Sequence, residues 1–244
     1  MSKLIDRLNQ IAKGGAQPIG FRAASGRTKS SPLLLIAVAG SDGGAVKEAR
    51  EHASAILFNS AAAAKLASEA GDLPWGVYIG ADGGNIDKLK SKGCDFIVFN
   101  ADDAPVSLLS DEGMGRMVEL TPGIADGLAR SASQLPVDAV LVGGEPALSV
   151  KRLLVCQHMS NMVGKPLIAR ASADMSDDEL RELWETGISG IAVDIAGDSG
   201  KKLVSLKETI DRLPASRRKR GGKPDVSLPY PVVDDSDIDM EEEE

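Results

Sequence analysis

One pattern recurs eight times between residues 33 and 213: a short apolar segment, a turn rich in Gly, Asp and Ser, and a stretch of helix length. The period is roughly 20 to 25 residues. Parallel strands need crossover connections, which are usually helices. Eight such units close most naturally into a single (β/α)8 barrel, a fold of about 250 residues. The sequence therefore predicts an α/β barrel, with an open doubly wound sheet as the alternative.

The expected strands are mostly apolar without alternation, as strands buried on both faces should be. They span residues 33–40, 55–60, 75–80, 95–100, 116–121, 138–144, 166–172 and 190–195. Helix-length stretches lie between them, and several of these end in a glycine shortly before the next strand, where a helix C-cap is expected. These glycines are Gly71, Gly93, Gly164 and Gly187.

Two segments fall outside the repeat and divide the chain into residues 1–32, 33–214 and 215–244. Apolar residues at helical spacing over residues 2–13 predict an amphipathic helix that covers one end of the barrel, and residues 18–24 are expected to form a lead-in strand or plug. Residues 215–244 have a basic cluster, an acidic end and few apolar residues, which predicts a disordered tail. This tail either only solubilises the chain or binds a protein partner.

The composition excludes several classes of protein. Residues 1–214 have 23 basic and 27 acidic side chains, so the body lacks the basic footprint of a nucleic-acid-binding protein. The two cysteines, Cys94 and Cys156, are too far apart in sequence to form a metal-binding motif, and reduced thiols in the cytoplasm are expected. No export signal and no apolar run of membrane-spanning length is visible, so we expect a cytoplasmic protein without a membrane contact.

Charged residues in the middle of strands identify a candidate site. The outer face of each strand contacts helices and must be apolar, so a charge in mid-strand points into the lumen. Glu119, Arg170 and Asp194 meet this criterion. Because an isolated lumen charge is costly, we expect the three to form an ion-paired network. Arg170 would then bind a carboxylate or phosphate, with Glu119 or Asp194 as general acid or base; a salt bridge that only fills the lumen is the alternative.

Other chemistries find little support in the sequence. No expected strand contains a lysine that could form a Schiff base. The only histidines, His52 and His158, lie in helical stretches, where a zinc site or a histidine acid/base is not expected. No flavin, nicotinamide or zinc motif is present, and the cofactor is left unassigned. Acid/base chemistry by carboxylates is the mechanism that the sequence still supports.

Acidic residues follow several strands, so the C-terminal rim of the barrel is expected to be acidic and able to take Mg²⁺. The candidate metal ligands are Asp42, Asp82, Asp103 and Glu145. Asp42 and Asp82 belong to the related segments SDGG and ADGG, each ahead of a helix. For these two, helix capping is the favoured interpretation, because Asp accepts hydrogen bonds from first-turn N–H groups.

Glycine-rich turns follow the sixth and eighth strands. The residues concerned are Gly143, Gly144, Gly197, Ser199, Gly200 and Lys201. With these turns and the repeat, residues 33–213 resemble, at the level of the fold, the aldolase-type, phosphate-binding (β/α)8 TIM-barrel superfamily. The resemblance implies a phosphate held by these turns and by a helix N-terminus, and lyase or isomerase activity. Tight strand-to-helix turns are the simpler explanation of the glycines.

Two hypotheses follow from the sequence. The first is a barrel that binds a small anionic metabolite, phosphorylated or carboxylated, and acts as a lyase or isomerase through carboxylate acid/base chemistry. The second is a non-catalytic barrel, a scaffold or subunit that recruits a protein partner through residues 215–244. The expected strand ends lack a catalytic lysine, histidine or cysteine, which leaves both hypotheses open.

Overall fold

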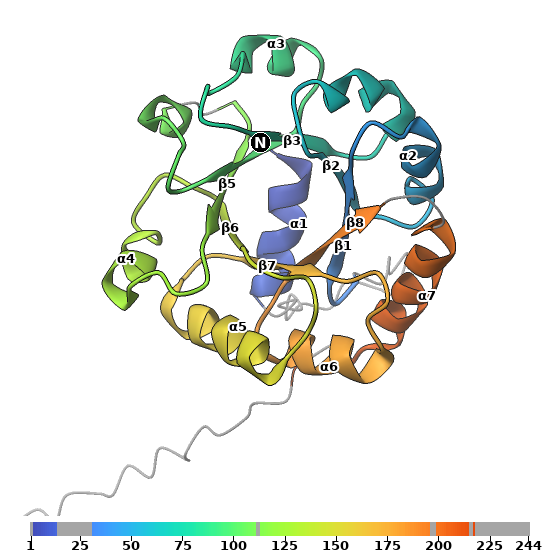
Figure 1. Ribbon diagram of the computed structural model, residues 1–244, viewed down its shortest axis with the longest axis vertical. Coiled ribbons are helices and arrows are strands. Elements are labelled where there is room, and N and C mark those ends of the chain that lie inside the picture. The colour runs from blue at the N-terminus through green and yellow to red at the C-terminus, as the bar shows by residue number, and fades with distance from the viewer. Residues whose placement is uncertain (1, 14–30, 111–112, 196–198, 215–216, 218–244) are drawn as a thin grey trace, which may run out of the picture.

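The computed structural model describes residues 2–13, 31–110, 113–195, 199–214 and 217 of the chain. Its eight strands are parallel and form a closed barrel in sequence order (Figure 1). The strands are β1 (Leu34–Ala39), β2 (Ala55–Phe58), β3 (Trp75–Ile79), β4 (Phe96–Asn100), β5 (Gly115–Leu120), β6 (Ala139–Val142), β7 (Leu167–Ala171) and β8 (Gly190–Ile195). The barrel prediction is confirmed, and the open sheet is excluded because β8 pairs with β1 along its whole length.

Helices surround the barrel (Figure 1). The α-helices of this outer ring are α2 (Gly43–Ala49), α3 (Ile86–Ser91), α4 (Asp126–Ser131), α5 (Val150–Met162), α6 (Asp177–Glu185) and α7 (Ser199–Arg212). Two expected helices are instead 3-10 helices, η1 (Ala63–Ala70) and η2 (Val106–Leu109). The N-cap residues, Ala62 of η1 and Pro105 of η2, make no side-chain hydrogen bond, although Ser60 Oγ accepts from Ala63 N at the start of η1 at 3.2 Å.

Three of the four expected helix-ending glycines adopt the positive φ that an αL cap requires, namely Gly71, Gly93 and Gly187. The expectation was wrong for Gly164. Helix α5 ends at a C-cap Val163 in extended conformation. The Gly164 N–H donates to Ser133 Oγ at 3.0 Å, outside the helix, so no left-handed residue is needed there.

Side chains alternate between the lumen and the outer helices along each strand, as the pleat requires. The inward residues are mostly apolar and pack into one cluster across the barrel axis. This cluster includes Leu34, Ile36, Val38, Leu57, Phe96, Val98, Met117, Leu141, Ile168 and Ala192. The lumen is therefore a packed core and not a channel.

Helix α1 (Lys3–Ala12) lies across the end of the barrel where the strands begin, which we call the floor (Figure 1). Leu4 and Leu8 are fully buried and belong to the lumen cluster. Gly115, the first residue of β5, has no room for a side chain because a Cβ would lie 2.6 Å from Ile5. The expected helix at one end of the barrel is thus confirmed, and its apolar face completes the core.

The carboxylate of Asp95, just before β4, fixes the start of α1. It accepts hydrogen bonds from Ser2 Oγ at 2.7 Å, from Lys3 N at 2.8 Å and from Leu4 N at 3.0 Å. A carboxylate at a helix N-terminus satisfies unpaired N–H groups and favourably meets the helix dipole. This contact joins the first residues of the chain to the fourth strand.

The remaining expectations for these parts of the chain are as follows. The expected strand or plug at 18–24 and the expected tail 215–244, apart from Arg217, lie outside the described residues. Cys94 and Cys156 are free and buried, and burial raises the pKa of both thiols, to about 12 for Cys94. Among the described residues, none of the helices is long and apolar enough to cross a membrane.

We expect Asp95→Ala to lower the free energy of unfolding by about 2 kcal/mol, because three hydrogen bonds from the start of α1 lose their acceptor. Urea denaturation of the full chain measures this change. Asp72→Ala is the matched control, since Asp72 is exposed between η1 and β3. Equal midpoints for the two variants would show that Asp95 does not hold α1 in place.

Candidate functional site

The candidate site lies in the lumen near the carboxyl ends of the strands, which we call the mouth. Glu119 lies on β5 and Arg170 on β7, as expected from their sequence positions, and Tyr78 on β3 joins them. Strands β3, β5 and β7 alternate around the barrel, and inward residues of alternate strands share a layer. The three side chains therefore meet in one polar layer above the apolar ones.

Glu119 is the centre of this layer. Its Oε2 accepts a hydrogen bond from the Tyr78 hydroxyl at 2.5 Å, and its Oε1 accepts one from Arg170 Nε at 3.1 Å. The residue is only 8% exposed. Because both carboxylate oxygens have strong donors, Glu119 fixes the positions of its two neighbours.

The positive charge of Arg170 is stabilised by its surroundings. Burial disfavours the charged guanidinium, but the hydrogen bond and charge of Glu119, together with the charge of Asp194, outweigh it and raise the pKa of Arg170. The side chain of Arg170 is 23% exposed, so the cation is accessible from the mouth. Its terminal nitrogens Nη1 and Nη2 donate to no residue in the part of the chain that the structure describes.

Tyr78 remains a neutral hydrogen-bond donor. Burial raises the pKa of its hydroxyl, and so do the hydrogen bond to Glu119 and the negative charge of that carboxylate. The charge of Arg170 and a hydrogen bond from Asn100 act in the opposite direction and are outweighed. The phenol therefore keeps its proton well above the ordinary range for tyrosine.

Asp194 occupies an inward position at the end of β8, in register with Val38 of β1. Its placement in the lumen agrees with the sequence prediction, because Val38 belongs to the lumen cluster. The expected three-way ion pair is wrong in one respect: in the described part of the chain, Arg170 pairs with Glu119 alone. Asp194 is exposed at the open end of the barrel, where water solvates its charge, and it acts on Arg170 only through longer-range attraction.

Gly143 lies directly against this network. A Cβ at Gly143 would be 3.0 Å from Glu119 Oε1, so the absence of a side chain makes room for the carboxylate. The Gly143 N–H donates to the Leu120 carbonyl at 2.9 Å and is not free for a phosphate. Gly144 has a φ of +99°, a left-handed conformation that glycine readily adopts. These two glycines are explained by close approach and a tight turn.

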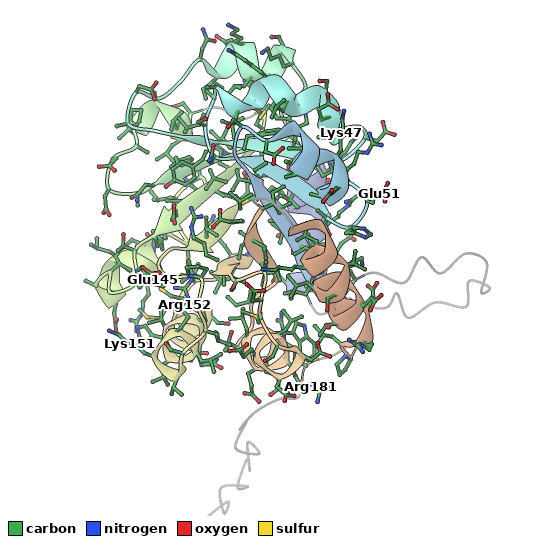
Figure 2. All side chains as sticks on the ribbon, turned by 45° about the vertical axis from the view of Figure 1, so that its right-hand side comes forward. Lys47, Glu51, Glu145, Lys151, Arg152 and Arg181 are labelled. Atoms are coloured by element: carbon green, nitrogen blue, oxygen red, sulfur yellow. The ribbon has the colours of Figure 1, made fainter. Side chains whose placement is uncertain are left out.

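Arg152 holds the end of β6 and was not identified from the sequence. It is 7% exposed near the start of α5 (Figure 2), and its guanidinium donates to the carbonyls of Val142, at 2.9 Å, and Gly143. Its Nε is buried and has no partner among the described residues. Arg152 thus positions the backbone segment that packs against Glu119.

The other half of the expected phosphate cradle is only partly described. Gly197 lies outside the described residues, while Ser199, Gly200 and Lys201 form the first turn of α7. Backbone N–H groups at the start of a helix of this length can bind an anion. The cradle stays a prediction.

The candidate metal ligands do not come together. Asp42 caps α2 by accepting from Gly44 N at 2.9 Å and Ala45 N at 3.3 Å, as expected. Capping was wrong for Asp82, because α3 is capped by Asn85 and the intervening Gly83 and Gly84 make a left-handed turn. Asp103 and Glu145 are exposed. Among the described residues, no three His, Cys, Asp or Glu side chains are grouped so that they could hold a metal ion.

The histidines lie away from the mouth. His158 is exposed on the outer face of α5 and contacts Asp126 of α4 at 2.9 Å. His52 follows the end of α2 and is half-buried. The expectation that His158 is a residue of the helix surface is confirmed.

Comparison with known proteins identifies the fold. No family model and no curated protein matches the sequence. Thiamine phosphate pyrophosphorylase from Pyrococcus furiosus is 19% identical, with a TM-score of 0.56 over 74% of this chain and 96% of that one. N-(5'-phosphoribosyl)anthranilate isomerase from the same organism is 15% identical, with a TM-score of 0.55 over 74% of this chain and 100% of that one. A mutant tryptophan synthase α-subunit from P. furiosus is 12% identical, with a TM-score of 0.53 over 73% and 96% of the two chains.

At these identities the likeness shows the fold and not the activity. The chain has the TIM-barrel fold, as the resemblance in sequence pattern implied. Function on this fold depends on the residues at the mouth, since the same barrel hosts many unrelated reactions.

The raised pKa of Tyr78 makes the free energy of unfolding depend on pH in the alkaline range. The ordinary pKa is 10.0, so the unfolded chain loses this proton at a pH where the native state keeps it. The stabilisation is complete below pH 10.0 and is lost as the pH rises through the raised pKa. We expect urea midpoints measured from about pH 8 to about pH 11 to fall less steeply in Tyr78→Phe than in the natural chain.

The second tyrosine of the chain, Tyr230, gives the matched control for this experiment. Tyr230→Phe should keep the pH dependence of the natural chain. If both variants flatten the curve equally, the Tyr78–Glu119 bond is not its source.

Proposed function

We propose that the mouth of the barrel binds a small carboxylated or phosphorylated metabolite, with Arg170 as its anion-binding group. The observation that supports this most directly is the geometry of the guanidinium. Glu119 holds Arg170 by its Nε alone, and Nη1 and Nη2 have no partner in the described chain. Two parallel N–H donors on one planar group match the two oxygens of a carboxylate or phosphate.

The burial of the ion pair between Arg170 and Glu119 favours the same role. Glu119 is 8% exposed, so the pair is largely withdrawn from water. A buried ion pair adds little net stability, because desolvation offsets most of the attraction. What the pair does supply is a fixed orientation for a cation that still reaches the mouth, which is what recognition of an anion requires.

The names of the compared structures fit this class of ligand. One is named for thiamine phosphate, and another for a phosphoribosyl compound that it isomerises. In the present chain, the start of α7 after β8 supplies backbone N–H groups at Ser199, Gly200 and Lys201 for the phosphate. Arg170 and this helix start both lie at the mouth.

We further propose that Asp194 is the acid/base group of a lyase or isomerase reaction. Glu119 is committed to Tyr78 and Arg170, whereas the exposed Asp194 carboxylate can exchange protons with a bound metabolite. Asp194 takes a proton from a carbon next to the anionic group, and Arg170 stabilises the negative charge left on the metabolite. Return of the proton to a neighbouring atom completes an isomerisation; loss of a leaving group instead completes an elimination.

Arg170→Met should weaken binding of the anion. A thermal-shift screen of the full chain with phosphorylated and carboxylated metabolites identifies ligands, and calorimetry then measures their affinity. We expect a loss of affinity of tenfold to a hundredfold, because a charge-assisted hydrogen bond is removed. Arg170→Lys should lose much of the affinity as well, because a lysine cannot form the paired contact.

Arg181→Met is the matched control for this experiment, since Arg181 is exposed on α6 and its loss changes the net charge equally. It should bind as the natural chain does. Undiminished affinity in both Arg170 variants would exclude Arg170 as the binding group.

Asp194→Asn should retain binding and lose proton exchange. Ligands from the screen are incubated with the protein in D₂O, and exchange of carbon-bound hydrogen is followed by NMR. We expect the exchange rate to fall at least about a hundredfold in Asp194→Asn, the range for loss of a general base. Asp174→Asn is the control, because Asp174 is paired with Lys202 at 2.8 Å. Exchange that persists in Asp194→Asn would exclude Asp194 as the base.

A further inference from the structure

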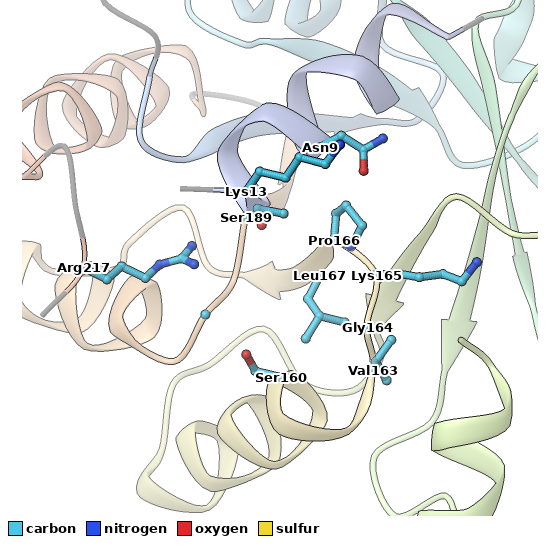
Figure 3. Close-up of a pocket in the computed structure, with 12 residues that line it drawn as sticks. Asn9, Lys13, Ser160, Val163, Gly164, Lys165, Pro166, Leu167, Ser189 and Arg217 are labelled. Atoms are coloured by element: carbon cyan, nitrogen blue, oxygen red, sulfur yellow. The ribbon is translucent and has the colours of Figure 1, made fainter. Parts of the chain in front are cut away.

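A pocket lies at the floor of the barrel, at the opposite end from the mouth. It has a volume of about 310 Å³ and is enclosed by the end of α1, the end of α5 and the residues that lead into β7 and β8 (Figure 3). Its polar lining residues are Asn9, Lys13, Ser160, Lys165, Ser189 and Arg217. None of the described residues that line it is acidic.

Arg217 is the most unusual of these residues. One of its terminal nitrogens donates to the Ile188 carbonyl at 2.5 Å, and its guanidinium carbon lies 5.6 Å from the centre of the Trp184 ring. Burial lowers the pKa of Arg217 and no charge partner opposes it. Its Nε is buried without a hydrogen-bond partner in the described chain. This partly buried cation therefore has no counter-ion in the part of the chain that the structure describes.

Lys13 and Lys165 add positive charge to the same pocket. Lys165 Nζ donates to the carbonyls of Leu135 at 3.0 Å and Val137 at 2.5 Å, whereas Lys13 is exposed at the end of α1. Among the residues that the structure describes, no carboxylate is within ion-pairing distance of Lys13, Lys165 or Arg217. Within the described residues these three cations thus have no ion-pair partner, and the charge of Asp138 acts on Lys165 only from a longer distance.

Basic residues alone do not identify an anion site here. The ends of α1 and α5 face the pocket, and helix C-termini attract cations through their dipoles. The carbonyls of Leu135 and Val137, between α4 and β6, explain the contacts of Lys165, and the Ile188 carbonyl before β8 explains one contact of Arg217. They do not explain donors that have no acceptor.

Ser189 is such a donor. It is 1% exposed, lines the pocket just before β8, and its Oγ has no hydrogen-bond partner in the described part of the chain. A buried hydroxyl without a partner costs free energy that a bound acceptor would restore. Ser189, Lys13 and Arg217 all line this pocket, and in Figure 3 the side chain of Arg217 extends toward it from one side.

We infer that the floor pocket binds an anionic group, a phosphate or a carboxylate, on Ser189, Arg217 and Lys13. An anion oxygen accepts from the Ser189 hydroxyl and the free donor of Arg217, and its charge neutralises a buried cation. The anion can be a free small molecule or a carboxylate of the chain's own acidic run at residues 234–244. This site is separate from the mouth and does not depend on the function proposed for it.

The test is a titration of the full-length chain with inorganic phosphate at constant ionic strength, followed by NMR of the backbone amides of Lys13, Ile188 and Ser189. We expect chemical-shift changes that saturate with phosphate, and an affinity for phosphate that falls at least about tenfold in Arg217→Met. Arg212→Met is the matched control: it removes the same charge from α7, where Arg212 pairs with Asp177 at 3.1 Å. Arg170→Met should also leave the shifts unchanged, which separates this site from the mouth.

The source of the anion is distinguished by a full-length variant in which every carboxylate of residues 234–244 is neutralised, each Asp being changed to Asn and each Glu to Gln. Tighter phosphate binding in this variant identifies the chain's own carboxylates as the occupant, and equal affinity identifies a free anion. Either result supports the site. Shifts that do not saturate in either chain, or that are equal in Arg217→Met, would overturn it.

Ser189→Ala gives an independent readout. Because the hydroxyl has no partner in the described chain, its removal should leave the unfolding midpoint unchanged or raise it while phosphate affinity falls. Lys13→Met serves as a second binding variant on an exposed residue where folding is not at risk. A loss of stability in Ser189→Ala, or unchanged phosphate affinity in both variants, would contradict the inference.

Discussion

The pairing of β8 with β1 closes the sheet, and this closure determines which side chains of the chain can meet. Because the register runs from Leu34 against Gly190 to Ala39 against Ile195, no edge is left, and every strand has one face toward the lumen and one toward the helices. Apolar residues fill the lower layers, and α1 covers them at the floor. Polar residues of the lumen can therefore gather only near the mouth, where water reaches them.

Glu119 is the residue through which this polar layer is organised. A carboxylate that is 8% exposed requires donors, and it has a phenol on one oxygen and a guanidinium on the other. Each contact constrains the other: the phenol keeps its proton because it is buried and donates to the carboxylate, and the carboxylate is held by the cation that it orients. Gly143 makes room for the carboxylate, and Arg152 holds the backbone of Gly143. The layer is thus supported by the end of β6 as well as by its own strands.

Most of the fold was predictable because strand burial and the crossover requirement leave clear patterns in sequence. The inward positions of Glu119, Arg170 and Asp194 followed from the cost of placing a charge against the helices. Tyr78 was missed because a tyrosine in an apolar strand resembles a core residue, although its place on an alternate strand could have identified it. The cap at Asn85 and the contacts of Arg152 with the end of β6 depend on local backbone geometry. So does the exposure to water of Asp194, which makes no ion pair with Arg170 in the described chain. Residue types alone do not specify this geometry.

The two ends of the barrel present opposite electrostatic environments, because parallel strands and their helices all run the same way. Helix N-termini face the mouth and C-termini face the floor, so the backbone favours anions at one end and cations at the other. At the mouth, Asp42 uses this field as a cap, while Arg170 extends into it as a cation held by Glu119. At the floor, the C-termini of the helices favour the cations around Ser189. The carbonyls of the described residues nevertheless leave Arg217 Nε and Ser189 Oγ without an acceptor. Since packed apolar layers separate the two ends, the lumen offers no path for a small molecule between the mouth and the floor pocket.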